Sequence, residues 1–177
     1  MLKKFNLIVS TYRKRENSCI SELWYFLKKL GDPEIKASKT GLPGLIIAYT
    51  KLDPFNVVNE LREIALERPW EFKYILKVVP IEYVIESDLE KIRSLILEKI
   101  DEKISIEETY KILPRIRRSN LSREKVIGEI APHINRKVNL SNPNKIILIE
   151  IIEDVAGISI LKEEQLLSIQ KIRLRRL

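Results

Sequence analysis

The nine residues KIILIEIIE at positions 145–153 constrain the fold of this chain most strongly. They form an almost unbroken run of large apolar side chains, which is typical of a strand that is buried on both faces. A strand of this kind needs hydrogen-bonded neighbours on both sides, so the surrounding residues must supply a sheet. The run therefore predicts the central strand of a domain that contains both strands and helices.

The residues before the central strand carry helix and strand signals in alternation. Ser87 and Asp88 precede a helix at 89–104, whose isoleucines and leucines recur at three- and four-residue spacing. Residues 109–113, TYKIL, have the pattern of a strand that Pro114 either shortens or confines to a sheet edge.

The alternation continues on both sides of the central strand. Ser122 is placed to cap a second helix, which is expected to reach Ile134. After the central strand, Gly157 is expected to mark the step to a short strand at 158–161. The second half of the chain therefore predicts an α/β domain of its own.

The first 85 residues have the element order β-α-β-β-α-β, which is the order of a ferredoxin-like domain. The first helix is expected to begin at Asn17 or Ser18, to stop at Gly31, and to turn Leu23, Trp24 and Leu27 inward. The second begins at Asp53 and Pro54. Strands are expected at 5–11, 33–38, 45–50 and 74–85.

These elements predict an α/β (α+β) protein of two small domains. A chain of 177 residues has room for two, since domains usually hold about 100–150 residues or fewer. The expected ranges are 1–86 for the ferredoxin-like domain and 87–177 for the second domain with a basic C-terminal tail. Element order alone says little about function.

Positive charge is concentrated where the second domain begins its strand and helix. Residues 107–145 hold nine Lys or Arg against four acids, a balance of 9 − 4 = +5, out of a formal net charge of +7 for the chain. A phosphate backbone is bound mainly by clustered Lys and Arg, so the sequence predicts a nucleic-acid partner. The predicted contacts are Arg115, Arg117, Arg118, Arg123, Lys125, Arg136, Lys145, Arg173 and Arg175.

Arg117 and Arg123 flank the predicted start of the second helix of this domain. A helix N-terminus offers unpaired N–H groups and partial positive charge to an anion, so cations beside it favour a phosphate site. The other reading is a solvated surface in a protein rich in Lys, Glu and Ile, a composition typical of growth at high temperature. In the C-terminal tail, Arg173 and Arg175 belong either to a basic extension or to a last secondary-structure element that lies beside the basic residues of 107–145.

The sequence offers no motif for chemistry. With five glycines it contains neither a dinucleotide-binding nor a P-loop pattern, so no enzyme activity and no cofactor is expected. Cys19, the one cysteine, is predicted to be a buried small side chain, and His133 has no second His or Cys with which to bind a metal. A single cysteine and the lack of a long apolar run predict a cytoplasmic protein with no membrane partner.

The basic stretch resembles the THUMP domain, a small α/β module found in several tRNA-modifying enzymes. The resemblance is carried by TYKI, by RIRRSNLSREKVIGEIA and by KVNLSNPNKIILIEII, in which VNLSNPN is the most specific part. It implies that Arg117 and Arg123 contact the tRNA backbone. Asn142 and Pro143 match the Asn-Pro of the motif, for which a turn is favoured over RNA contact. Asn139 departs from the usual Asp but keeps a side chain that can cap a turn.

The N-terminal half extends the resemblance through SCISELWYFLKKLGD and LKVVPI, which are similar to segments of stand-alone THUMP proteins. Eukaryotic members of that group are similar to the adaptor for N4-acetylcytidine formation in tRNA, where a separate RNA cytidine acetyltransferase transfers the acetyl group. The resemblance implies a tRNA-binding adaptor, with tRNA and such an acetyltransferase as partners. Two alternatives are a scaffold for an acidic protein and a tRNA-modifying enzyme with unrecognised chemistry.

Overall fold

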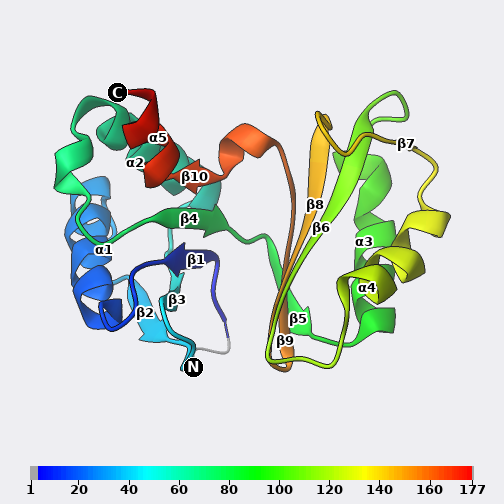
Figure 1. Cartoon of the computed structure of the whole chain (residues 1–177), viewed down its shortest axis with the longest axis horizontal. Helices are drawn as coiled ribbons and strands as arrows, with labels where there is room; N and C mark the ends of the chain where they lie inside the picture. Colours follow the sequence, from blue (N-terminus) through cyan, green and yellow to red (C-terminus); the bar gives the residue numbers. More distant parts are fainter. Residues whose placement is uncertain (1–3, 177) are drawn as a thin grey trace. The chain divides into compact units, whose positions relative to one another are not determined.

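The computed structural model describes residues 4–176, which fall into two compact units (Figure 1). The first unit combines Met1–Ile81 with Glu164–Leu177, and the second is Glu82–Glu163. Each unit has its own five-stranded sheet and its own apolar core. The prediction of an α+β fold is confirmed.

The first unit has a sheet of strand order β10-β4-β1-β3-β2, in which all neighbours are antiparallel. Its order β4-β1-β3-β2, with two helices between the strands, is that of the ferredoxin-like fold. The elements are β1 (Leu7–Ser10), α1 (Glu16–Leu30), β2 (Lys36–Lys39), β3 (Leu45–Tyr49), α2 (Pro54–Glu67), the 3-10 helix η1 (Pro69–Glu71), β4 (Lys77–Pro80), β10 (Leu167–Ser168) and α5 (Ile169–Arg175).

The apolar side chains of α1 and α2 pack on this sheet because they recur at helical spacing. Asp53 caps α2 as expected, its carboxylate accepting the N–H of Phe55 at 2.8 Å, and Pro54 follows at the first helical position. Helix α1 begins at Glu16, one residue before Asn17 and two before Ser18, and Arg15 at its N-cap position makes no side-chain cap. Phe26 is fully buried in place of Trp24, which is 53% exposed, so the prediction for Trp24 was wrong.

Cys19 lies on the buried side of α1 as predicted. Burial raises the pKa of its thiol from 9.0 to about 12. At pH ~8 the folded protein therefore holds on the order of a thousandfold less thiolate than the unfolded chain. We expect a thiol reagent to modify Cys19 only after denaturation, and stability to fall as the pH rises above about 9, where the unfolded thiol loses its proton first. Rapid labelling of the folded protein would contradict this.

The second unit has a sheet of strand order β5-β9-β8-β6-β7. Strand β6 runs parallel to β8 and to β7, and the other neighbours are antiparallel. Helices α3 and α4 lie together on one side of this sheet (Figure 1). The elements are β5 (Tyr83–Glu86), α3 (Leu89–Lys103), β6 (Thr109–Arg117), α4 (Arg123–Ile130), the 3-10 helix η2 (Ala131–His133), β7 (Lys137–Val138), β8 (Lys145–Ile152) and β9 (Val155–Leu161). The 3-10 helix η3 (Glu163–Gln165) spans the boundary between the two units in the sequence.

The apolar run at 145–153 forms β8, which lies between β6 and β9 as predicted. Pro114 does not shorten β6, because β7 pairs only with Thr109 and Tyr110 and leaves the strand beyond them paired on one side. Gly157 lies inside β9, and the chain instead turns after β8 at Glu153, whose φ is +55°. Helix α4 ends at Ile130, earlier than expected, because η2 with Pro132 follows it.

The bounds of the two units differ from the ranges 1–86 and 87–177. The predicted fourth strand divides, so that β4 joins the first sheet and β5 pairs with β9 in the second. The chain end returns to the first unit, where β10 pairs with β4 and Ile169 and Ile172 of α5 enter the core. No helix among residues 4–176 is long and apolar enough to cross a membrane.

Candidate functional site

The candidate site is the free edge of β6 together with the first turn of α4. Beyond Tyr110, β6 pairs with β8 only, so one edge of the strand carries no partner among the described strands. Side chains alternate along β6, and Tyr110 and Ile112 enter the core with the helices. Lys111, Arg115 and Arg117 are therefore on the opposite face of the strand.

Arg115 and Arg117 share one buried carboxylate on the neighbouring strand. Glu150 of β8 is fully buried, and it lies in register with Arg115. Its Oε1 accepts from Arg115 Nη1 at 3.0 Å, and its Oε2 accepts from Arg117 Nη1 at 2.5 Å. The two arginine side chains stay 32% and 30% exposed, and the trio keeps a net charge of +1. A guanidinium has five donors, so both arginines are held in place with donors left over for an anion.

The first turn of α4 carries the cations Arg123 and Lys125 on either side of one acid, Glu124, at the end where the helix dipole favours anions. Ser122 caps it as predicted, its Oγ accepting the N–H of Lys125 at 3.2 Å. Arg123 reaches back to the free edge of β6, where its Nη1 donates to the carbonyl of Pro114 at 3.3 Å. The Lys125 side chain is exposed and makes no hydrogen bond or ion pair within residues 4–176. Cations in a first turn cost a helix about 0.3–1 kcal/mol each, so stability of α4 does not explain them.

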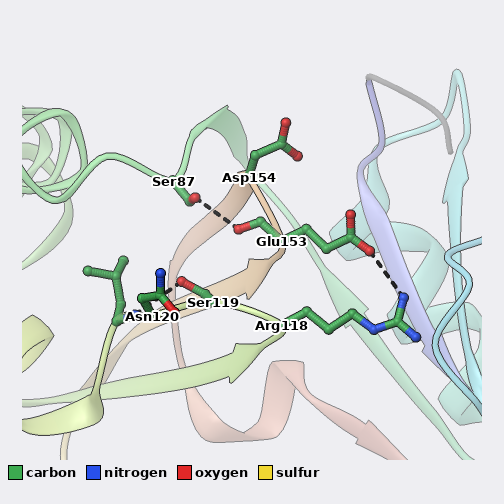
Figure 2. Close-up of a pocket in the computed structure, with 7 residues that line it drawn as sticks. Ser87, Arg118, Ser119, Asn120, Glu153 and Asp154 are labelled. Atoms are coloured by element: carbon green, nitrogen blue, oxygen red, sulfur yellow. Dashed lines mark hydrogen bonds and ion pairs between the residues drawn. The ribbon is translucent and has the colours of Figure 1, made fainter.

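Arg118 lies at the end of β6, apart from this anion-binding geometry. Its φ is +52°, and its guanidinium pairs with exposed Glu153 at 3.4 Å (Figure 2). Both residues border an open hollow of about 630 Å³, into which the carboxylate of Asp154 brings a second negative charge. With two acids against one cation, this hollow does not favour phosphate. Its lining consists of Ser87, Arg118, Ser119, Asn120, Leu121, Glu153 and Asp154.

Arg136 and Lys145 are engaged at the C-terminal end of α3. Arg136 donates to the carbonyl of Ile104 from Nε at 3.2 Å and from Nη2 at 2.7 Å, and its side chain is 8% exposed. Lys145 Nζ donates to the carbonyl of Lys103 at 2.6 Å. The last carbonyls of a helix lack partners within it, so both cations complete the end of α3. The Ser105 N–H, with Lys145 nearby, holds the pKa of the Glu108 carboxyl below its usual value.

We expect Arg136→Ala to destabilise the protein by about 1.5–3 kcal/mol, because the Ile104 carbonyl loses a charged donor. Its exposed neighbour Lys137, whose side chain makes no hydrogen bond or ion pair among the described residues, supplies the matched control Lys137→Ala. Urea unfolding of both variants measures the difference. Equal midpoints would show that Arg136 does not hold the end of α3.

Arg173 and Arg175 are on α5 and belong to the first unit, not to the unit that holds the other predicted contacts. Arg173 donates from its guanidinium to the carbonyl of Phe72. Arg175 is exposed near the end of the helix. The expected basic tail is therefore a packed helix, with Ile169 and Ile172 buried beneath its arginines.

The VNLSNPN motif builds the turn that leads into β8. Asn139 Oδ1 accepts the N–H groups of Ser141 at 3.2 Å and of Asn142 at 3.0 Å, so the expected turn cap is confirmed. Asn144 Oδ1 accepts the N–H of Thr109 at 2.8 Å, which ties the turn to the start of β6. The motif thus fixes the register of the strand that carries Arg115 and Arg117.

Two residues of the site were not singled out from the sequence. Glu150 is the one charge inside the apolar run of β8, and its signal is this interruption opposite a strand with alternating arginines. Asn144 follows Pro143 directly and could be recognised only through its contact with Thr109, which is 35 residues away in the sequence.

Comparison with known proteins identifies the second unit. Residues 86–161 match the THUMP domain family. No curated protein matches the chain by sequence.

Several solved structures share the fold. PH1313 from Pyrococcus horikoshii Ot3 matches 90% of the chain, with a TM-score of 0.63 and 21% identity. TrmN from Thermus thermophilus matches 89%, with a TM-score of 0.60 and 12% identity. A 4-thiouridine synthetase in complex with RNA and ATP matches 90%, with a TM-score of 0.53 and 11% identity. The chain covers 55%, 45% and 42% of these three chains, so it spans about half of their length.

The match to residues 86–161 includes all of α3, β6, α4 and β8, and therefore the whole candidate site. The chain contains a THUMP domain at residues 86–161, and a domain of this family implies RNA binding in tRNA modification.

Proposed function

We propose that this chain is a non-catalytic adaptor that binds tRNA and serves a separate modification enzyme, an RNA cytidine acetyltransferase that forms N4-acetylcytidine. The observation that carries the proposal is the THUMP domain with two arginines held on one face of β6 and two cations in the first turn of α4. One of the structures with this fold is a 4-thiouridine synthetase solved with RNA.

The geometry of the arginines suits a phosphate backbone. Glu150 holds Arg115 and Arg117 side by side on β6, so little side-chain entropy is lost when they bind an anion. Arg123 and Lys125 add charge at a helix start, where backbone N–H groups also favour an anion. These contacts read charge and shape and carry no base specificity.

A role in substrate binding is supported by the share of its relatives that the chain matches. The chain matches about half of each of three proteins, one of them a 4-thiouridine synthetase. A segment that several proteins share suits the binding of a substrate better than the catalysis of one particular reaction.

Deletion of the gene in its source organism tests the proposal. We expect N4-acetylcytidine to disappear from the tRNA pool, as measured by mass spectrometry of nucleosides. The wild-type gene should restore it, and a gene carrying Arg123→Glu with Lys125→Glu should not. Loss of a different modified nucleoside would contradict the acetylation step, and an unchanged nucleoside profile would contradict the adaptor role.

A further inference from the structure

The outer face of α1 combines aromatic and basic side chains at one helical spacing. Trp24 is 53% and Tyr25 is 49% exposed, whereas Leu23, Phe26 and Leu27 beside them on α1 are fully buried. Residues three and four apart share a helix face, so these two rings lie beside the lysines that follow by one turn. The face, which we call the α1 outer face, consists of Asn17, Ser21, Trp24, Tyr25, Lys28 and Lys29.

Both acids of α1 are turned away from this face. Glu16 Oε1 accepts the N–H of Gly44 at 3.0 Å. The carboxylate of Glu22 accepts three backbone N–H groups at 2.7–3.0 Å, those of Lys73, Tyr74 and Ile75. The charge of the α1 outer face therefore comes from Lys28 and Lys29 alone. The segment before it adds three exposed cations, Arg13, Lys14 and Arg15.

The two rings differ in how they are held. Tyr25 packs edge-on against Phe26 at 5.3 Å, and Phe26 stacks on Phe72 at 4.4 Å in the core. Lys29 Nζ donates to the Tyr25 hydroxyl at 2.5 Å and lies 4.3 Å from its ring centre. The Trp24 ring has no aromatic or cationic partner among residues 4–176. Tyr25 is thus held by its neighbours, whereas Trp24 is half exposed without a ring partner among residues 4–176.

We infer that the α1 outer face is a second RNA contact, where unpaired bases stack on Trp24 and Tyr25 while Lys28 and the cations before α1 meet the phosphates. The inference rests on the proposed RNA binding and adds a single-stranded segment to it. Every base has a π face, so aromatic rings interleaved with cations bind single strands without a particular sequence. Aromatic side chains suit a protein partner as well, but the charge favours RNA, because lysine is depleted from protein interfaces and the face carries no acid for a mixed-charge interface.

The test compares variants of the whole chain by their affinity for three RNAs: a tRNA, a single strand of about 12 nucleotides, and a blunt duplex. We expect Trp24→Ala to weaken binding of the tRNA and the single strand by about tenfold and to leave the duplex unchanged, since one stacked base is lost. Trp24→Phe should keep most of the affinity. The matched control is Trp70→Ala, because Trp70 is 65% exposed in the same unit and should change each affinity by less than about twofold.

Fluorescence supplies a readout that a purely structural role would not change. The chain has two tryptophans, so Trp70→Phe leaves Trp24 as the sole indole. We expect its emission to be quenched by the single strand and not by the duplex.

The outcomes separate this inference from the proposed function. If the wild-type chain binds none of the three RNAs, both fail. If it binds tRNA and Arg123→Glu with Lys125→Glu weakens binding while Trp24→Ala matches Trp70→Ala, only the second contact is overturned. If Trp24→Ala leaves RNA affinity intact but abolishes capture of a protein, the α1 outer face is a protein-docking surface and the inference is wrong.

Discussion

Glu150→Ala is expected to lower the free energy of unfolding by about 2–3 kcal/mol. Glu150 is fully buried and forms ion pairs with both Arg115 and Arg117. Its removal leaves two guanidiniums without this counter-charge, and loss of one partner of a buried pair costs about 3–5 kcal/mol. The expected value is smaller, because each arginine stays about a third exposed and water compensates part of the loss.

Two further variants make this prediction specific. Glu150→Gln keeps the size and the hydrogen-bond acceptor, so it should cost less than the alanine. Glu129→Ala removes a carboxylate that pairs with Arg93 at 3.2 Å but is 46% exposed, and it should change stability by less than about 1 kcal/mol. Denaturant unfolding measures all three. If Glu150→Ala matched Glu129→Ala, Glu150 would not hold the two arginines.

Arg123→Glu combined with Lys125→Glu is expected to weaken tRNA binding by about 10- to 100-fold near physiological salt, because phosphate contacts are removed. The fold should not suffer, since glutamates in the first turn of α4 agree with the helix dipole. The substitution at Arg123 also removes the hydrogen bond from its guanidinium to the carbonyl of Pro114. Filter binding or anisotropy measures the affinity, and unfolding in urea checks the stability.

The matched control changes the charge by the same amount on α3. Lys91 holds the same place in α3 as Lys125 in α4, the third residue of the helix with its N–H bonded to the capping side chain. Lys99 supplies the second cation of α3, beside the ring of Tyr83. We expect Lys91→Glu with Lys99→Glu to change tRNA affinity by less than about threefold. Equal losses of affinity in both double variants would mean that net charge alone governs binding.

Much of the fold could be predicted because local signals agreed with the tertiary structure. Three elements are indicated by residues that lie close together in the sequence: β8 by its apolar run, α2 by Asp53 and Pro54 at its start, and α4 by its Ser122 cap. The spacing of apolar residues and the chemistry of helix caps are local properties, so both can be recognised in the sequence before any tertiary contact is known.

The structure differs from the predictions where the fold depends on pairing between residues that are far apart in the sequence. No local signal shows that residues 74–86 divide between two sheets, or that β10 and α5 return to the first unit far downstream of β4. Trp24 fits the apolar spacing of α1, yet the fully buried Phe26 fills the core and stacks on Phe72. Packing against Phe72, far along the chain, therefore places Phe26 and not Trp24 in the core.

The cations of the site could be counted from the sequence, but their partners could not. Arg136 and Lys145 have the same charge as Lys125, and only the structure shows that both complete the end of α3. The role of Glu150 depends on the register between β6 and β8, which sequence spacing does not state. The contacts with RNA therefore stay predictions for Arg115, Arg117, Arg118, Arg123, Lys125, Arg136, Lys145, Arg173 and Arg175.

The proposed function requires that the THUMP domain bind tRNA through its phosphates. The most direct test is the affinity of the wild-type chain for intact tRNA, for tRNA without its 3′ single-stranded end and for an unrelated duplex, each between about 50 and 200 mM salt. We expect preference for intact tRNA and a steep loss of affinity with salt, whose slope falls by about 2 in the Arg123→Glu, Lys125→Glu variant. Weak binding that ignores both salt and the kind of RNA would contradict it.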